Sequence, residues 1–466
     1  MKHDYSIRPP EYRGQTAPDA VNRIQPFQIT AVKQIRQDDH GGGSTPAWEI
    51  TFAVPSLKKQ GAAEQKAVAD GILAAGMQIA LLPVNDRSRV RRAMEGLSDA
   101  YRRVADGEGL RKVPRIVTAN IPGRDGVKSP PQELTAEEMI AHTIDLTRPT
   151  DDLIALANKI RPGFIPAGQE DDYKKIPVEE FVNLPGMKGR ISLEQLAYNQ
   201  PPLENRKYTP SRVDPQKGEI GIMVSEVHQN VTLPDGRQLH GRGTTTGMLA
   251  DMARDFLDDK PQAVNGFLDL RKHKLPYNKE TRDGKPDKPK ILISTGVGIA
   301  PHLAYLRECH TKGVTPNVPL LLTGDRTEKD HLQEDEIRSY LPEGVLHYAH
   351  SRPAQGEGQY VGQALREHGA AVWKALQEGG SLYLCGREDM REQVDASLKH
   401  IAHEVGQIPE ADTQLWLDTL YQKKGAPKAP KQIEESMSFD DRFFKEKYEK
   451  LKRARGDNPQ PGASIV

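Results

Sequence analysis

The feature that most constrains this 466-residue chain is a regular alternation of apolar strands and helices that begins near residue 285. The apolar runs KILIS, PLLLT and SLYLC are each followed by a segment with helical spacing. Strands that lack polar alternation are buried on both faces, which is typical of parallel sheets covered by helices on both sides. The sequence therefore predicts a doubly wound parallel sheet over residues 285–425.

The preceding part of the chain has a different pattern. Alternating or β-branched runs separated by glycine-rich and proline-rich turns predict a β region, in two parts over residues 25–105 and 199–284. Short helical segments predict a helical insertion over residues 106–198. Thr135, three residues before a glutamate, resembles a capping box, and Thr150 is a candidate cap for a second helix.

The two ends and the overall composition limit the class of protein. Residues 1–24 read as a polar arm, and residues 426–466 as a charged tail. Lysine plus arginine equals aspartate plus glutamate at 65 each, which argues against a protein that coats nucleic acid. No apolar run is long enough to span a bilayer, and no secretory signal is visible. The two cysteines, Cys309 and Cys385, fit a reducing cytoplasm.

Two segments in the strand–helix region have candidate chemistry. Gly296 and Gly298 lie between an apolar strand and a helix, where glycines let the backbone approach a pyrophosphate. Cys385 and Gly386 end a later strand, at the sheet edge where open α/β sheets bind ligands. The alternative for Cys385 is inert packing, which is commoner for a buried cysteine.

Two earlier segments are less specific when taken alone. Arg206–Ser211 reads as a strand with one arginine. Gly243–Leu249 reads as a glycine-rich and threonine-rich turn that opens a helix, where the helix dipole favours a phosphate. The alternative for this second segment is an ordinary capped turn.

Together, the order and spacing of these segments resemble the ferredoxin–NADP reductase superfamily, in particular the reductase half of diflavin enzymes such as cytochrome P450 reductase and sulfite reductase flavoprotein. The resemblance extends over roughly residues 24–425. The positions that match the family motifs are Arg206, Tyr208, Thr209 and, one place early, Ser211; Gly243, Thr246 and Leu249, with Thr245 where cysteine is common; Gly296, Gly298, Ile299, Ala300 and Pro301; and Cys385, Gly386 and Met390. The resemblance implies an antiparallel FAD-binding β-barrel with a helical insertion, followed by a doubly wound nucleotide-binding domain.

The resemblance also implies a role for each matched residue. Arg206, Gly243, Thr245 and Thr246 would hold the flavin pyrophosphate. Tyr208 would stack on the isoalloxazine and Thr209 would place a hydroxyl near flavin N5, with Ser211 nearby. Gly296 and Gly298 would hold the diphosphate of the nicotinamide nucleotide. Cys385, followed by Gly386, would lie beside the nicotinamide.

The preferred nucleotide follows from a third group of residues. Ser351, Arg352 and Tyr360 match the positions that contact the 2′-phosphate and the adenine in the family, so NADPH is expected. Gly358 and Gly362 replace the usual lysine and glutamine, which leaves NADH possible. Ser351 and Arg352 could instead belong to a solvated loop.

The expected electron acceptor is a separate protein. The 24-residue arm is too short for a flavodoxin-like FMN domain, so a ferredoxin, flavodoxin or haemoprotein in trans is expected. An arginine cluster could dock such an acidic partner, although a solvated helix face is the commoner explanation. The arginines of this cluster are Arg87, Arg89, Arg91 and Arg92. Phe439 and Phe443 are candidates, by chemistry alone, for the terminal aromatic that covers the flavin in the family, although packing of the tail or of a partner is the commoner role for such residues.

The preferred interpretation is a cytoplasmic FAD-dependent NAD(P)H oxidoreductase in electron transport, with no metal site and no nucleic-acid partner. One alternative is a degenerate family member that serves as a binding scaffold or assembly subunit without turnover. Another alternative is a flavoenzyme that passes electrons to oxygen.

Overall fold

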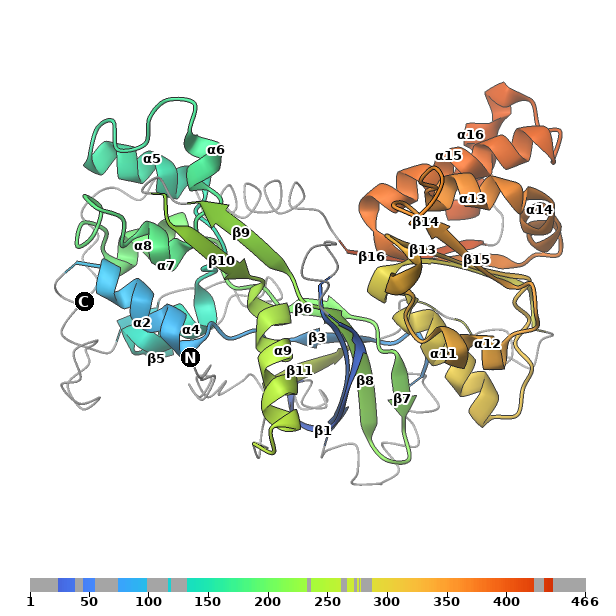
Figure 1. The fold of residues 1–466 in the computed structure, drawn as a ribbon, viewed down its shortest axis with the longest axis horizontal. Coiled ribbons are helices and arrows are strands. Elements are labelled where there is room, and N and C mark those ends of the chain that lie inside the picture. Colours follow the sequence, from blue (N-terminus) through green and yellow to red (C-terminus); the bar gives the residue numbers. More distant parts are fainter. Residues whose placement is uncertain are drawn as a thin grey trace.

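The computed structural model describes residues 24–37, 45–54, 74–98, 116–118, 132–232, 236–260, 266–271, 275, 277, 287–422 and 431–438. Figure 1 shows an antiparallel sheet that lies between a helical part on one side and a parallel-sheet domain on the other. This mixture of an antiparallel and a parallel sheet confirms the predicted fold class at that level.

The antiparallel sheet has seven strands in the order β6-β3-β11-β1-β2-β8-β7. These strands are β1 (Ile24–Arg36), β2 (Ala47–Ala53), β3 (Gln78–Leu81), β6 (Arg206–Tyr208), β7 (Arg212–Asp214), β8 (Glu219–Ser225) and β11 (Gly266–Arg271). The long strand β1 pairs first with β11 and then with β2, through register shifts that bend a strand. Apolar side chains such as Phe27, Ile50 and Phe52 pack against Met248 and Leu249 of helix α9 (Thr244–Leu257).

The closed barrel that the resemblance implies is not confirmed. Strands β6 and β7 form the two edges of the sheet, and in the described part of the chain no pairing joins them. The edges are nevertheless consecutive in the sequence, because only Thr209, Pro210 and Ser211 separate β6 from β7. Since an extended chain spans at most about 3.6 Å per residue, the two edges lie within about 15 Å of each other.

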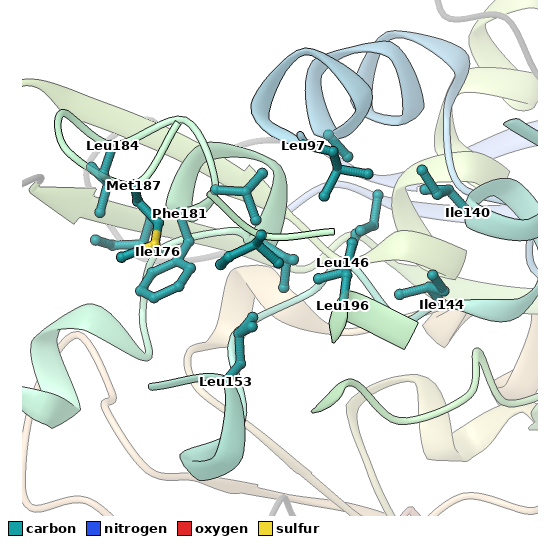
Figure 2. Close-up of a cluster of buried hydrophobic side chains, with 14 of the residues drawn as sticks. Leu97, Ile140, Ile144, Leu146, Leu153, Ile176, Phe181, Leu184, Met187 and Leu196 are labelled. Atoms are coloured by element: carbon teal, nitrogen blue, oxygen red, sulfur yellow. The ribbon is translucent and has the colours of Figure 1, made fainter. Parts of the chain in front are cut away.

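The helical part has its own core. Its helices are α2 (Arg87–Gly96), α4 (Ala136–Thr143), α5 (Asp151–Ile160), α6 (Glu170–Tyr173), α7 (Val178–Phe181) and α8 (Leu193–Asn199). Two small antiparallel strand pairs also occur: β4 (Ile116–Thr118) pairs with β5 (Gln132–Leu134), and β9 (His228–Thr232) pairs with β10 (Gln238–Arg242). Figure 2 shows side chains from separate segments, among them Leu97, Leu146 and Phe181, meeting in this core. Helix α2 packs into this core through Val90 and Met94, although the expected insertion begins later in the sequence.

The predicted helix caps in this part are confirmed. The Thr135 hydroxyl accepts a hydrogen bond from the amide of Glu138 at 3.1 Å, and the Glu138 carboxylate accepts one from the amide of Thr135 at 2.7 Å. The Thr150 hydroxyl accepts one from the amide of Leu153 at 3.1 Å. These hydroxyls satisfy amide groups that the first helical turn leaves open.

Replacing Thr135 by alanine is expected to lower the free energy of unfolding by about 1 kcal/mol, because the capping box loses its acceptor. Urea unfolding monitored by circular dichroism measures this change. The matched control is Thr419→Ala, because Thr419 donates only to the carbonyl of Leu415 within its own helix. An equal loss in both variants would contradict a capping role for Thr135.

The parallel sheet has the strand order β14-β13-β12-β15-β16. Its strands are β12 (Lys290–Thr295), β13 (Leu320–Asp325), β14 (Leu346–His350), β15 (Ser381–Arg387) and β16 (Ile433–Ser438). Alternate residues of β12 face opposite cores: Leu292 packs with α11 (Ala300–Thr311) and α12 (Glu334–Tyr340), and Ile291 packs with the helices of the other face. Those helices are α13 (Val361–Glu367), α14 (Gly369–Gln377), α15 (Glu388–Glu404) and α16 (Thr413–Tyr421). The described residues of this domain also form three short 3-10 helices, η3 (Gly296–Ile299), η4 (Glu328–Asp330) and η5 (Glu410–Asp412).

Strand β16 lies within the range that the sequence assigns to a charged tail. It pairs in parallel with β15 from Ile433, opposite Leu382, to Ser438, opposite Arg387. Residues 433–438 are therefore part of the sheet. None of the helices in the described ranges is both long enough and apolar enough to cross a bilayer.

Candidate functional site

The strand order reverses between β12 and β15. Strands β13 and β14 lie on one side of β12, and β15 and β16 lie on the other side. Open α/β sheets bind ligands outside the carboxyl ends of the strands at such a switch point. Ser294 of β12 lies opposite Cys385 of β15 in the register. Two predicted segments that are far apart in the sequence are therefore neighbours at this edge.

The glycine loop lies directly against the end of β15. A Cβ atom on Gly298 would collide with the carbonyl group of Cys385, and a Cβ atom on Gly386 would collide with the Thr295 hydroxyl. Both collisions involve the short gap between the two strand ends. Glycine at both positions lets the two backbones approach closely.

Helix α11 begins directly after this loop. Gly296 has a φ of +52°, in the left-handed region that glycine adopts without steric cost. Pro301 lies in the first turn, where its fixed φ suits a helix and its missing N–H is not needed. The preceding residue is Ile299, which has no polar side chain to cap the helix. The remaining amide groups and the positive end of the helix dipole suit an anionic ligand.

Two hydroxyls beside the loop have unused hydrogen-bonding capacity. The Oγ of Ser294 and the Oγ1 of Thr295 are buried, and neither has a hydrogen-bond partner among the residues that the structure describes. Leaving a buried polar group unsatisfied costs about 1–3 kcal/mol. A polar ligand at this edge would remove that cost, so the residues present fit a nucleotide diphosphate.

The predicted 2′-phosphate residues lie at the neighbouring strand ends. Ser351 follows β14, and its amide donates to the carbonyl of Asp325 at 3.0 Å. The amide of Arg352 donates to the carbonyl of Arg326 at 2.7 Å, which brings two arginines together. The side chains of Arg326 and Arg352 are both exposed, and within the described ranges neither guanidinium has a carboxylate partner. Arg326 is a second cationic residue for this site, and its position directly after a strand is the signal that indicates it.

Close packing explains the two glycines that depart from the family pattern, Gly358 in the loop and Gly362 in α13. A Cβ atom on Gly358 would collide with the Ser351 carbonyl, so a lysine there would displace the loop. A Cβ atom on Gly362 would lie 2.9 Å from the carbonyl oxygen of Gln393. Tyr360 lies between these glycines and is 57% exposed, which leaves its ring available for stacking.

On the antiparallel sheet, the predicted flavin residues lie on the edge strand β6. Tyr208 pairs with Ile79 and Arg206 pairs with Leu81 of β3. The Tyr208 ring is half-buried against the apolar core of the sheet. Burial raises the pKa of the Tyr208 hydroxyl, and the nearby charge of Arg206 lowers it in part. Thr209 follows at the end of the strand, so the three residues remain adjacent on one edge.

The other predicted flavin segment opens helix α9. Gly243 is the residue before the helix and has no side chain that caps it. The Thr246 hydroxyl accepts a hydrogen bond from the amide of Val227 at 3.3 Å. The Thr245 hydroxyl is buried and has no partner in the part of the chain that the structure describes. Arg89 reaches the same helix end, donating to the Thr244 hydroxyl at 3.3 Å. This helix end therefore fits an anionic group.

Ser211 contributes to a contact between the two sheets. Its hydroxyl is fully buried and donates to the carboxylate of Glu49 at 2.8 Å. The guanidinium of Arg307, on α11, donates to the carbonyl of Ser211 at 3.1 Å and also to Glu49. Neither Glu49 nor Arg307 lies in a recognisable motif, and no local pattern in the sequence indicates that they meet.

The predicted docking arginines are largely used within the protein. Arg87 pairs with Glu137 at 3.4 Å, and Arg92 pairs with Glu180 at 3.0 Å. Arg89 pairs with a buried carboxylate of α7, and only Arg91 has an exposed side chain. The cluster therefore stabilises the packing of α2 on neighbouring helices, and this disfavours the docking hypothesis.

The C-terminal predictions fall partly outside the described residues. Trp416, Leu417 and Asp418, which resemble an earlier part of the family ending, lie on α16. Phe439 and Phe443 lie outside the described residues. Strand β16 ends at Ser438, one residue before Phe439.

Comparisons with known proteins agree with these observations. Residues 292–396 match the family model of the oxidoreductase NAD-binding domain. The sulfite reductase (NADPH) flavoprotein alpha-component of Mannheimia succiniciproducens is 29% identical over 240 residues, which cover 50% of this chain and 37% of that relative. The corresponding protein of Salmonella arizonae is 28% identical over 274 residues, which cover 54% of this chain and 44% of the relative.

A third relative, the same component of Shewanella oneidensis, is 32% identical over 166 residues, which cover 34% of this chain and 26% of the relative. The chain thus spans less than half the length of each of these three relatives.

Proposed function

We propose that this chain is an FAD-dependent NAD(P)H oxidoreductase. The relatives confirm its resemblance to the ferredoxin–NADP reductase superfamily, in the diflavin-reductase type. The chain takes a hydride from NADPH, or NADH, onto FAD and passes single electrons to a separate protein. The observation that carries the proposal is the meeting of Gly298 and Cys385 at the switch point, beside the buried hydroxyls of Ser294 and Thr295. A cytoplasmic location stays a prediction.

On the parallel sheet, the chain binds the nicotinamide nucleotide through its diphosphate. The amide groups around Gly296 and Gly298 and the start of α11 hold the phosphates. Ser294 and Thr295 offer hydroxyl donors at the same edge. Cys385 orients the nicotinamide, and Gly386 lets this end of β15 pack closely against Thr295.

On the antiparallel sheet, the chain binds FAD. Arg206 on β6 and the start of α9, with Gly243, Thr245 and Thr246, hold the pyrophosphate. Tyr208 stacks on the isoalloxazine, while Thr209 holds a hydroxyl near N5. The three-residue link between the edge strands β6 and β7 supports an FAD-binding barrel formed by this sheet, because it keeps the adjoining ends of the two edges close.

When bound, FAD supplies the change from two-electron to one-electron chemistry, because it accepts a hydride and releases electrons singly. The residues of the chain contribute geometry and electrostatics. Their main task is to keep the two bound rings within reacting distance and to exclude water from the space between them.

The acceptor is a separate protein such as a ferredoxin, flavodoxin or haemoprotein. The names of the relatives support this, because each is the flavoprotein alpha-component of a sulfite reductase, a name that implies a further component.

Arg352→Ala is expected to lower kcat/KM for NADPH by about 10- to 100-fold and to leave kcat/KM for NADH nearly unchanged, because a charge-assisted hydrogen bond to the 2′-phosphate is worth about 1.5–3 kcal/mol. Steady-state reduction of a dye acceptor measures both values. The matched control is Arg338→Ala, because Arg338 is an exposed arginine of the same domain whose carboxylate partner is Glu334. Equal losses with both nucleotides would contradict a 2′-phosphate role for Arg352.

The proposed function is tested on the purified full chain. We expect a yellow protein that contains FAD and is bleached anaerobically by NADPH more readily than by NADH. Mixing the reduced protein with ferredoxin, flavodoxin and a haemoprotein then identifies the acceptor class, and rapid oxidation by air alone would indicate an oxidase. A colourless protein that does not bind added FAD would reject the proposal and favour a scaffold without turnover.

A further inference from the structure

A buried ionic cluster joins the two sheets. We call it the interdomain clasp and define it as Glu49 on β2, Arg307 on α11 and Glu336 on α12, together with Ser211. Arg307 donates to Glu49 through both of its terminal nitrogens, and to Glu336 at 2.7 and 2.8 Å. The second oxygen of Glu49 also accepts from the side-chain amide of Gln333 at 2.9 Å.

The centre of the clasp, where Arg307 meets Glu49, is shielded from water, whereas Glu336 is partly exposed. Glu49 is 6% exposed and Arg307 is 9% exposed. Burial raises the pKa of Glu49. The hydrogen bond and the charge interaction with Arg307 lower this pKa by a larger amount, so that it lies below its usual value. Glu49 is therefore charged, and its low-dielectric surroundings strengthen its interaction with the Arg307 guanidinium.

A buried ion pair contributes less to stability than to geometry. Apolar residues of the same volume would often stabilise an interface as well, whereas removing one partner leaves an unpaired buried charge. The guanidinium of Arg307 is planar and contacts both carboxylates and the Ser211 carbonyl. This geometry fixes direction as well as distance, because the fork of donors can satisfy all these acceptors in only one orientation.

The clasp connects the two proposed cofactor sites by short rigid paths. Ser211 ends the link that carries Thr209 away from β6, and this link continues directly into β7. Arg307 lies on the helix that begins beside Gly298, about 10 Å along its axis at about 1.5 Å per residue. Helix α11 and strand β7 are in contact and lie next to each other in Figure 1.

We propose that Arg307 is a positioning residue for hydride transfer, which fixes the nucleotide-binding domain relative to the flavin edge through Glu49 and Ser211. This inference rests on the proposed function. Arg307 touches neither proposed cofactor site. Its effect is to hold the start of α11 and the β6–β7 link at one separation, and so to set the distance between the two bound rings.

The test compares Arg307→Met, Arg307→Lys and the wild type in anaerobic rapid-mixing experiments with NADPH. We expect Arg307→Met to lower the limiting rate of flavin reduction by about 10- to 100-fold, because a displacement near 1 Å can cost about that much. The FAD content and the affinity for NADP⁺ should stay unchanged, because both binding sites are intact. Arg307→Lys should fall between the two, because one ammonium group cannot contact both carboxylates in the same way.

A second readout does not depend on turnover. Stacking of NADP⁺ on the reduced flavin gives a long-wavelength charge-transfer absorbance, which should weaken in Arg307→Met and recover in part in Arg307→Lys. The matched control is Arg391→Met, because Arg391 contacts Asp395 and the ring of Tyr421, all within the parallel-sheet domain. This control should keep both the rate and the absorbance of the wild type.

Each failure has a separate meaning. A wild type that neither NADPH nor NADH reduces would reject the proposed function. A wild type that is reduced normally, with Arg307→Met equal to it in rate and absorbance, would overturn only the positioning role.

If Arg307→Met does not fold, Glu49→Gln and Gln333→Ala weaken the same clasp without leaving a buried positive charge wholly unpaired. Wild-type rates and absorbance in both of these variants would likewise overturn the proposal.

Discussion

Replacing Gly298 by alanine is expected to slow flavin reduction by NADPH by about 100-fold or more, through weaker nucleotide binding and a displaced nicotinamide. The Cβ atom would collide with the carbonyl group of Cys385, which is backbone and cannot move aside by changing rotamer. Either the loop or the end of β15 must therefore shift. Calorimetric titration with NADP⁺ and rapid-mixing reduction measure the two effects.

The control for Gly298→Ala is Gly313→Ala, after the end of α11. Gly313 has a φ of +64°, so alanine there strains the backbone, but nothing lies near its Cβ position. The control should lose about 1 kcal/mol of stability and keep normal nucleotide binding. Normal NADP⁺ affinity in Gly298→Ala would remove the glycine loop from the proposed nucleotide site.

The second large effect concerns His302, which is fully buried beneath β12. Its Nε2 donates to the carbonyl of Ile293 at 3.0 Å, and its Nδ1 accepts from the hydroxyl of Tyr277 at 2.7 Å. Burial lowers the pKa of His302 to about 4, while the bond to Ile293 raises it in part. The folded protein therefore holds a neutral imidazole at a pH where the unfolded chain binds a proton.

The sign of the pH dependence follows from this difference. As the pH falls from about 6.5 to about 4, the unfolded state binds more protons than the folded state, so stability is lost. Because one pKa unit is worth about 1.4 kcal/mol, the wild type should lose about 3 kcal/mol relative to a His302→Gln variant. Urea unfolding of both proteins between pH 7 and pH 4 measures the difference, and parallel curves would contradict the prediction.

Asp325 provides a control with the opposite sign. Burial and the neighbouring charge of Asp330 raise its pKa to about 7, while Arg36 lowers it in part. The folded state therefore binds a proton that the unfolded state has already released, and this contribution to stability grows as the pH falls. An Asp325→Asn variant should lose this gain, so its difference from the wild type should change with pH in the reverse direction.

Local sequence patterns were sufficient for the features in which neighbours along the chain decide the structure. Gly298 could be located because it follows a continuous apolar strand, and Cys385 because it lies near the end of another; such strands end at one edge of a parallel sheet. The capping role of Thr135 could be predicted because both partners of the capping box lie within one helical turn.

The features that the sequence did not reveal depend on long-range contacts or on partial burial. Glu49 and Arg307 are 258 residues apart, and each looks like an ordinary surface charge in its own segment. Arg89 resembled part of a docking patch because its partner, Glu179, lies on another helix. Strand β16 was not recognised because an edge strand has one neighbour, and its sequence IEESMS has no continuous apolar run.

Strand β16 also determines where the chain can be shortened. A recombinant version ending near residue 425 would expose the main-chain N–H and C=O groups along one side of β15. Such an open edge can recruit a strand from another molecule and lead to aggregation. The loss of Ile433, which is fully buried, would also uncover apolar surface below it. Expression tags and truncations are therefore best placed beyond Ser438, since a shorter version would precipitate for reasons unrelated to cofactor binding.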